Sequence, residues 1–180
     1  KDEKVSFQNA RIVLGCFLTG QRIDEMNQYI LRQKATGNPG SPWLMNPHGD
    51  YDFNAMAFTA VFHLFKDNPE ILYPETRAHL LEHILTIEGS DFTRNVAYTA
   101  FQDTENHILM AETSRYLKNQ WLWENGNKSP EYDNKNNGME EALTQFLKEI
   151  DTYGFYEFNS APYLGYAYST LLVLNEFTTG

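Results

Sequence analysis

The run Thr104-Glu105-Asn106-His107 holds the side chains of this sequence that are best suited to chemistry. It opens a helix-forming segment that continues from Ile108 to Asn119, so Asn106 and His107 are expected in the first helical turn. The positive end of a helix dipole favours neutral imidazole, which can take a proton near neutral pH. The run therefore predicts a base beside a hydrogen-bond donor. The alternative is that both residues only cap the helix and bond to a neighbouring loop.

Two phenols are expected near this pair. Tyr163 and Tyr166 fall in the first turns of a helix predicted from Ser160 to Phe177. If the two helices run parallel, these tyrosines lie at the same end of the bundle as His107. A phenol can give a proton to a leaving oxygen, or take one from carbon when its pKa is lowered. The alternative is that both are core tyrosines with hydrogen-bonded hydroxyls.

Glu105 and Glu157 are the best carboxylate pair for the same end of the bundle. A glycoside hydrolase needs two carboxyl groups about 5–10 Å apart across the bond that it cuts. Asp50, Asp52 and Asp103 are further candidates, and most such groups in proteins are solvated surface charges. The pair therefore indicates hydrolase chemistry only weakly.

The run His79-Leu80-Leu81-Glu82-His83 matches the H-x-x-E-H pattern of one class of zinc peptidases. Helical spacing places its leucines on the buried face and its two histidines and glutamate on the solvated face. No third ligand is identifiable. Since a Gly-rich phosphate loop and a serine nucleophile elbow are also missing from the sequence, we expect neither a metal nor a cofactor.

The composition is that of one globular domain with a sizeable core: 180 residues, 42% hydrophobic and 14% aromatic. The net charge of −10 argues against nucleic acid and anionic membranes as partners, and no apolar run reaches the length of a membrane span. Flat aromatic surfaces suit sugar rings. Trp43, Trp121 and Tyr156, with the amide of Asn159, are therefore candidate substrate-binding residues for an oligo- or polysaccharide.

Apolar spacing and helix-breaking residues predict seven helices. The expected ranges are 5–18, 22–34, 52–66, 74–88, 104–119, 139–153 and 160–177, with a buried strand as the alternative for the first. Gly and Pro mark residues 36–50 as a loop, residues 91–102 form an extended connector, and 121–138 form a polar loop.

Three of these helices are apolar on nearly every face, and they begin near Asp52, Thr104 and Ser160. They alternate with clearly amphipathic helices, and Leu64, Leu117 and Leu174 align within them at separations of 53 and 57 positions. Two helices in so long a period predict stacked helical hairpins, with inner helices alternating with outer ones. A closed toroid of six hairpins, at roughly 50 residues each, needs more chain than this. We therefore expect an all-α fold, an incomplete (α/α) toroid, whose single domain 1–180 forms part of a larger chain.

Three segments carry a resemblance to a known group of proteins. They are Thr104-Glu105-Asn106-His107, then Tyr116-Leu117, then Gly154-Phe155-Tyr156-Glu157-Phe158-Asn159-Ser160 followed by Tyr163. The pattern resembles large bacterial proteins that have S-E-N-H, Y-L, G-F-x-E-W-x-S and Y in this order, with Thr104 replacing Ser and Phe158 replacing Trp. The resemblance covers roughly residues 50–177. Such proteins look like α/α-toroid members, the architecture of alginate lyases and of the helical half of heparinase-type lyases.

The resemblance implies a secreted or periplasmic polysaccharide lyase that acts by β-elimination on a uronate-containing glycan. Asn106 and His107 match the Asn-His pair of the alginate lyases, and Tyr163 or Tyr166 matches their tyrosine. The arginine that precedes this tyrosine in the lyases has no counterpart, since Glu157 and Asn159 occupy that region. A non-catalytic glycan-binding or structural helical domain is the alternative, and a glycoside hydrolase using Glu105 and Glu157 is a further one.

Overall fold

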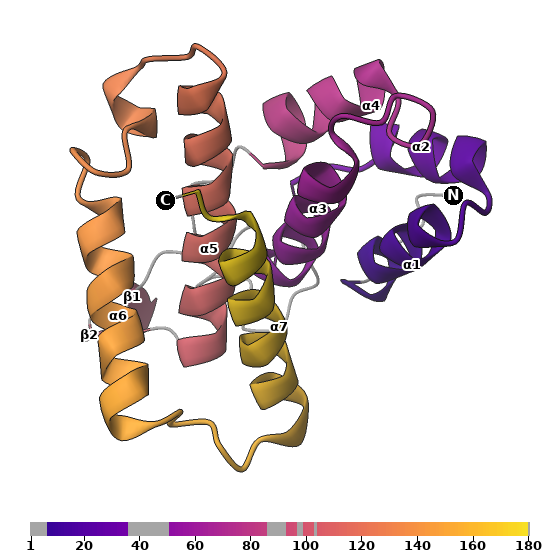
Figure 1. Ribbon diagram of the computed structural model, residues 1–180. Coiled ribbons are helices and arrows are strands. Elements are labelled where there is room, and N and C mark those ends of the chain that lie inside the picture. Colours follow the sequence, from indigo (N-terminus) through magenta and orange to yellow (C-terminus); the bar gives the residue numbers. More distant parts are fainter. Residues whose placement is uncertain (1–6, 36–50, 86–92, 97–98, 103, 180) are drawn as a thin grey trace.

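The protein is built almost entirely from helices (Figure 1). The computed structural model describes residues 7–35, 51–85, 93–96, 99–102 and 104–179. Within these ranges it has seven α-helices, which confirms the expected all-α class. They are α1 (Phe7–Leu18), α2 (Ile23–Leu31), α3 (Asp52–Phe65), α4 (Pro74–His79), α5 (Glu105–Glu124), α6 (Met139–Tyr153) and α7 (Ala161–Phe177).

Four shorter elements complete the described chain. The turn of π-helix η1 (Leu80–Ile84) continues α4, and the 3₁₀ turn η2 (Pro130–Tyr132) follows α5. Strands β1 (Thr93–Val96) and β2 (Thr99–Gln102) pair antiparallel. The segment predicted as an extended connector therefore contains a small hairpin.

The prediction that residues 121–138 form a loop is wrong at its start, because α5 continues to Glu124. The ring of Trp121 packs edge-on against Phe62, with 5.0 Å between centroids, so tertiary contact extends the helix beyond Asn119. The helix ends where Gly126 takes a φ of 98°, a conformation that favours glycine.

The N-terminal ends of four helices meet at one end of the bundle. Asp52 at the start of α3 lies against His107 in the first turn of α5. The next residue, Phe53, packs edge-on against Tyr166 of α7, with 4.6 Å between ring centroids. Arg11 of α1 lies over the same tyrosine ring, 4.3 Å from its centroid.

The C-terminal ends of the same helices also meet. His63 of α3 stacks on Phe177 of α7 at 5.1 Å between centroids, near the contact between Phe62 and Trp121. At the end of α1, Phe17 packs against Phe65 of α3 at 5.6 Å. Contacts at both ends show that α1, α3, α5 and α7 run parallel.

The remaining helices lie on the outside of this row. In Figure 1, α6 runs alongside α5, while α2 and α4 lie beyond α1 and α3. We call α1, α3, α5 and α7 the inner helices and α2, α4 and α6 the outer helices. The predicted alignment of Leu64, Leu117 and Leu174 is wrong for Leu64. Leu117 is fully buried and Leu174 is 8% exposed, whereas Leu64 is 45% exposed and points away from the core. No helix within the described part of the chain is long and apolar enough to cross a membrane.

The buried end of α3 makes the fold sensitive to pH. His63 is 8% exposed and lies between the rings of Phe62 and Phe177. Burial, with a smaller effect from the charge of Lys66, lowers the pKa of His63 from its ordinary value to about 4. The folded protein therefore holds this imidazole neutral at pH values where the unfolded chain binds a proton.

We expect His63→Leu to reduce the loss of stability in acid. The pKa of His63 is lower in the folded protein than in the unfolded chain. The contribution of neutral His63 to the free energy of unfolding is therefore complete above pH 6.5, the unfolded value, and is lost as the pH falls toward 4. Between pH 7 and pH 4 the free energy of unfolding of the variant should rise, relative to that of the unmodified protein, by about 3 kcal/mol. Urea titrations at both pH values measure this difference. The exposed His83→Gln is the control, and an equal pH dependence for both variants would contradict the assignment.

Candidate active site

The first turn of α5 is held by a carboxylate from the connector between α6 and α7. The backbone N–H of Asn106 donates to Glu157 Oε2 at 3.0 Å. In the amide orientation that satisfies its surroundings, Asn106 Nδ2 also donates to Glu157 Oε2 at 2.7 Å and to Oε1 at 3.2 Å, and lies 2.8 Å from Thr104 Oγ1. The N–H groups at a helix start have no partner within the helix, so an anion is stabilising there. Glu157 serves as that anion for α5.

A second carboxylate makes the reciprocal bond. Glu105 Oε2 accepts a hydrogen bond of 3.0 Å from the backbone N–H of Tyr156. Glu105 is 7% exposed, and its burial, with the nearby charge of Glu157, raises its pKa, while the Tyr156 N–H acts in the opposite sense. We call Glu105, Asn106, Glu157 and the Tyr156 backbone the carboxylate clamp. It joins two segments that are 51 positions apart in the chain.

His107, one residue after the clamp, forms a pair with Asp52. Its Nδ1 lies 2.6 Å from Asp52 Oδ2, and the two side chains are 12% and 5% exposed. The ring also packs edge-on against Phe53, with 5.2 Å between centroids. A buried carboxylate at Nδ1 orients an imidazole and stabilises its protonated form after it has taken a proton. This arrangement is suited to general-base chemistry.

A phenol and a cation complete the group. Arg11 Nη1 lies 3.4 Å from the Tyr166 hydroxyl, and the guanidinium covers the ring face. The Tyr163 ring is 6.4 Å from that of Tyr166 and is 41% exposed. The candidate site therefore consists of a His-Asp pair and, connected to it through the Phe53 ring, two phenols and one arginine.

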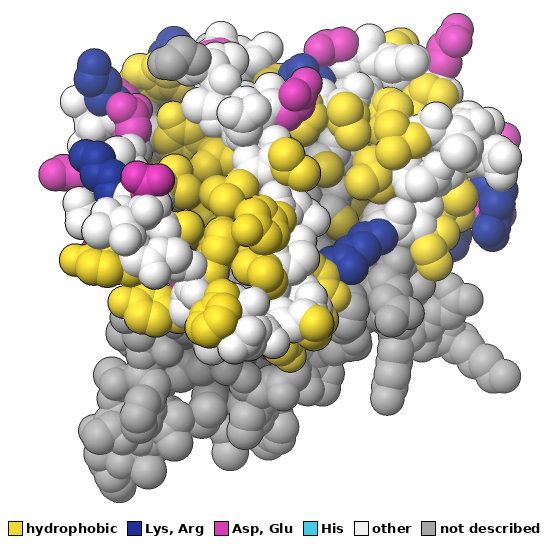
Figure 2. All heavy atoms as spheres, turned by 60° about the horizontal axis from the view of Figure 1, so that its bottom comes forward, with side chains coloured by type: hydrophobic (Ala, Val, Ile, Leu, Met, Phe, Trp, Pro, Cys, Tyr) yellow, Lys and Arg dark blue, Asp and Glu magenta, His cyan; other side chains and the backbone are white. Residues whose placement is uncertain are grey.

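Exposed aromatic side chains surround this end of the molecule. Figure 2 views it from below and shows hydrophobic side chains gathered over a large part of the surface. Tyr156 is 80% exposed and Phe158 66% exposed, both on the connector that carries Glu157. Asn159 is exposed on the same connector. These side chains form an apolar rim beside the candidate site.

The structure gathers most of the residues that the sequence indicated. Asn106, His107, Glu105, Glu157, Tyr163 and Tyr166 all lie at this end of the bundle. Trp121 is at the opposite end of α5, about 21 Å along the helix from His107, and is therefore not part of the group. Trp43, Asp50 and Asp103 lie outside the described residues.

The H-x-x-E-H run lies apart from this site. Leu80 and Ile84 are fully buried, while Glu82 and His83 are exposed, as the helical spacing predicted. His79 Nε2 lies 3.1 Å from the Gln33 carbonyl oxygen. Among the residues with described positions, no three His, Cys, Asp or Glu side chains are grouped so that they could hold a metal ion.

Sequence reasoning missed Arg11 and the pairing of Asp52. Arg11 is 155 positions from its partner Tyr166, and nothing in its own neighbourhood marks it. Asp52 carried a detectable signal, because it begins an inner helix just as Glu105 does. The structure thus places an arginine from α1 against Tyr166.

Comparisons with known proteins add nothing to this geometry: no protein-family model, curated protein or solved structure matches the chain.

The clamp predicts a large effect on stability when Glu157 is removed. Glu157→Ala leaves the Asn106 N–H and its buried amide without their anionic acceptor, and Asn106 is fully buried. We expect the free energy of unfolding to fall by about 2–4 kcal/mol. Chemical denaturation measures the loss. Asp151→Ala, an exposed carboxylate on α6, is the matched control and should change stability by less than about 0.5 kcal/mol. Equal effects of the two substitutions would show that the clamp contributes nothing to stability.

Proposed function

We propose that this protein is a polysaccharide lyase that cleaves a uronate-containing glycan by β-elimination, with His107 as the base. The observation that supports this best is the 2.6 Å contact between His107 and Asp52. The Phe53 ring connects this pair to Tyr166, over which Arg11 lies. The parallel inner helices, with outer helices beside them, favour an arc of an (α/α) toroid as the architecture. A secreted or periplasmic location belongs to the same proposal.

The chemistry follows from the groups at the site. His107 takes the proton from C5, the carbon next to the uronate carboxylate, and Asp52 stabilises the imidazolium that forms. The electron pair of the broken C–H bond forms a C4–C5 double bond and expels the glycosidic oxygen from C4. Tyr166 or Tyr163 gives its hydroxyl proton to that oxygen. The reaction consumes no water. Turnover is completed when His107 releases the abstracted proton to solvent and the tyrosine takes a proton from solvent.

Arg11 is the group that suits the substrate carboxylate. Loss of the proton builds negative charge on this carboxylate, so a cation beside it stabilises the transition state. The Asn106 amide, the expected hydrogen-bond donor beside the base, is not available for this role, because it donates to Glu157 and is fully buried. The Arg11 side chain is exposed to solvent and lies against the Tyr166 ring. We therefore propose that Arg11 binds the substrate carboxylate. Asn106 instead positions the start of α5 through its bonds to Glu157.

The aromatic rim supports a carbohydrate as the ligand. Tyr156, Phe158 and Tyr163 are exposed beside the site, and aromatic faces stack on the apolar faces of sugar rings. A glycan-binding domain without catalysis would use the same rim. The glycoside hydrolase alternative has less support, because Glu105 and Glu157 both accept backbone hydrogen bonds within the clamp.

The proposal predicts an unsaturated product. Mixing the protein with alginate, heparin-type and pectin-type chains should raise the ultraviolet absorbance of the C4–C5 double bond with at least one of them. His107→Ala and Asp52→Asn should each lower kcat by about 10²-fold or more, since one removes the base and the other its partner. Arg11→Ala should lower kcat as well as raise KM, because the cation binds the carboxylate most strongly in the transition state, and Tyr166→Phe should lower kcat.

The exposed His83→Ala is the control for these variants and should retain full activity. Undiminished activity in both His107→Ala and Asp52→Asn would refute the assignment of the base. Binding of an oligosaccharide by titration calorimetry, without product from any of the three polymers, would identify a glycan-binding domain instead.

A further inference from the structure

A second site lies away from the candidate active site, toward the C-terminal ends of α5 and α7. It is an open groove of about 440 Å³ between α6 and α7, with Tyr116 of α5 in its floor. The cavity is large enough for several side chains of a partner or for a drug-sized molecule. The lining from α6 consists of Glu140, Leu143, Thr144 and Leu147, and that from α7 consists of Leu171, Leu174, Asn175 and Thr178.

Both walls of the groove repeat the same helical spacing. Each contributes residues at positions i, i+3, i+4 and i+7, starting at Glu140 on α6 and at Leu171 on α7. Residues with this spacing form one face of a helix, and ridges of this kind pack against the ridges of another helix. Seven residues of helix extend about 10 Å, so the groove is about two turns long. Its shape therefore suits an α-helix.

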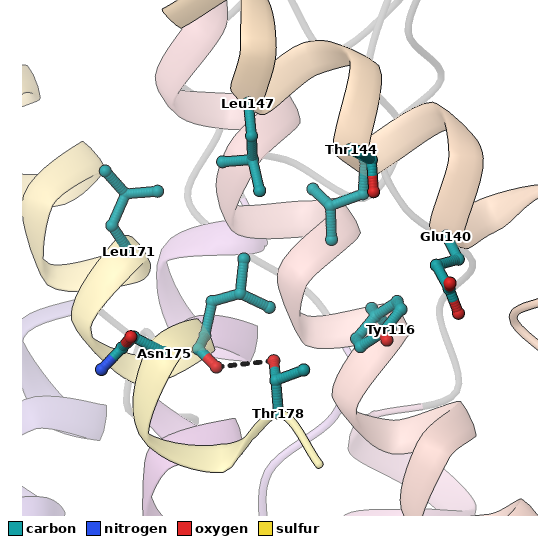
Figure 3. A pocket seen from close by; sticks show the side chains of 9 residues that line it. Tyr116, Glu140, Thr144, Leu147, Leu171, Asn175 and Thr178 are labelled. Carbon is teal, nitrogen blue, oxygen red and sulfur yellow. Dashed lines mark hydrogen bonds between the residues drawn. The ribbon is translucent and has the colours of Figure 1, made fainter. Parts of the chain in front are cut away.

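The groove is apolar at one end and acidic at the other. Figure 3 shows Leu147 and Leu171 together at one end, and Glu140, Tyr116 and Thr178 together at the other. Glu124 adds a second carboxylate there: after burial, the charges of Glu140 and Glu124 are what raise the pKa of the Tyr116 hydroxyl. The C-terminal end of α7 also carries the negative end of its dipole. An occupant with an apolar body and one cationic end would match this distribution.

We propose that this groove is a docking site for an amphipathic helix of a partner protein, with an apolar face toward Leu147 and Leu171 and a Lys or Arg beside Glu140. Helix-in-groove recognition uses apolar anchors at i, i+3, i+4 and i+7. A second copy of this chain fits less well. Its exposed α7 face, with Tyr168 and Leu172, also carries Glu176, which would meet carboxylates at the acidic end. The proposal is independent of the lyase activity.

The experiment selects binders from a displayed library of amphipathic helical peptides, with the intact protein as target and the Leu171→Asp variant for counter-selection. The enriched peptides should share the i, i+3, i+4, i+7 apolar pattern and a basic residue at one end. Fluorescence anisotropy should show a Kd at least about tenfold lower for the unmodified protein than for Leu171→Asp or Leu147→Asp. Circular dichroism and thermal melting establish that each variant is folded.

A charge reversal provides the sharpest control, because it does not disturb the core. Selection against Glu140→Lys should enrich peptides with an acidic residue at the same end, and the original peptides should bind this variant about tenfold or more weakly. Equal binding to Leu171→Asp, an unchanged charge preference with Glu140→Lys, or no enrichment at all would overturn the proposal. A dimer in sedimentation that Leu171→Asp dissociates would identify a second copy as the occupant, and would overturn it too.

Discussion

The reciprocal bonding of Glu105 and Glu157 is the interaction on which the candidate site depends. Each carboxylate accepts a backbone N–H from the segment that carries the other, at 3.0 Å in both cases. The free N–H groups at the start of α5 require an acceptor, and the connector before α7 supplies one. This exchange aligns the starts of α5 and α7, so that His107 and Tyr166 can meet the same ring of Phe53. The arrangement has an electrostatic cost, since two carboxylates share a partly buried region and the pKa of Glu105 is raised.

The effect of this local interaction on the site depends on the parallel direction of the inner helices. Antiparallel neighbours would place helix starts at opposite ends of the bundle, whereas here four of them lie together. Helix starts are places where short polar side chains are favoured as caps and where anions are stabilised. A bundle of parallel inner helices therefore concentrates Asp, Glu, Asn and His at one end. The opposite end is apolar, with Phe62, Trp121 and Phe177 in contact with their neighbours and His63 held neutral among them.

The two surfaces proposed to be functional differ because they use different parts of the same helices. The candidate active site is formed near helix starts, where Asp52 and Phe53 of α3 contact the His107 imidazole of α5, and Phe53 also contacts Tyr166 of α7. The groove is formed by the sides of α6 and α7, where apolar ridges lie open. A polar cluster at helix ends suits proton transfer, and a pair of ridges suits packing. One surface can therefore be altered without the other, as Glu140 is far from the clamp in both sequence and structure.

The sequence by itself determined the helices and the local pairs within them. Helical periodicity is a property of neighbouring residues, so the α-helical class, the start of α5 and the adjacency of Asn106 and His107 could all be predicted. Contacts between distant segments could not, because they depend on how helices pack. The His107–Asp52 pair joins positions 55 apart, and Arg11 meets Tyr166 across 155 positions. Packing also decided that α5 extends to Glu124, that Leu64 faces solvent and that the Asn106 amide is bound by Glu157. Side chains that identify a chemistry can thus be read from the sequence, but which of them share one site is decided by the tertiary structure, since only packing brings distant helix starts together.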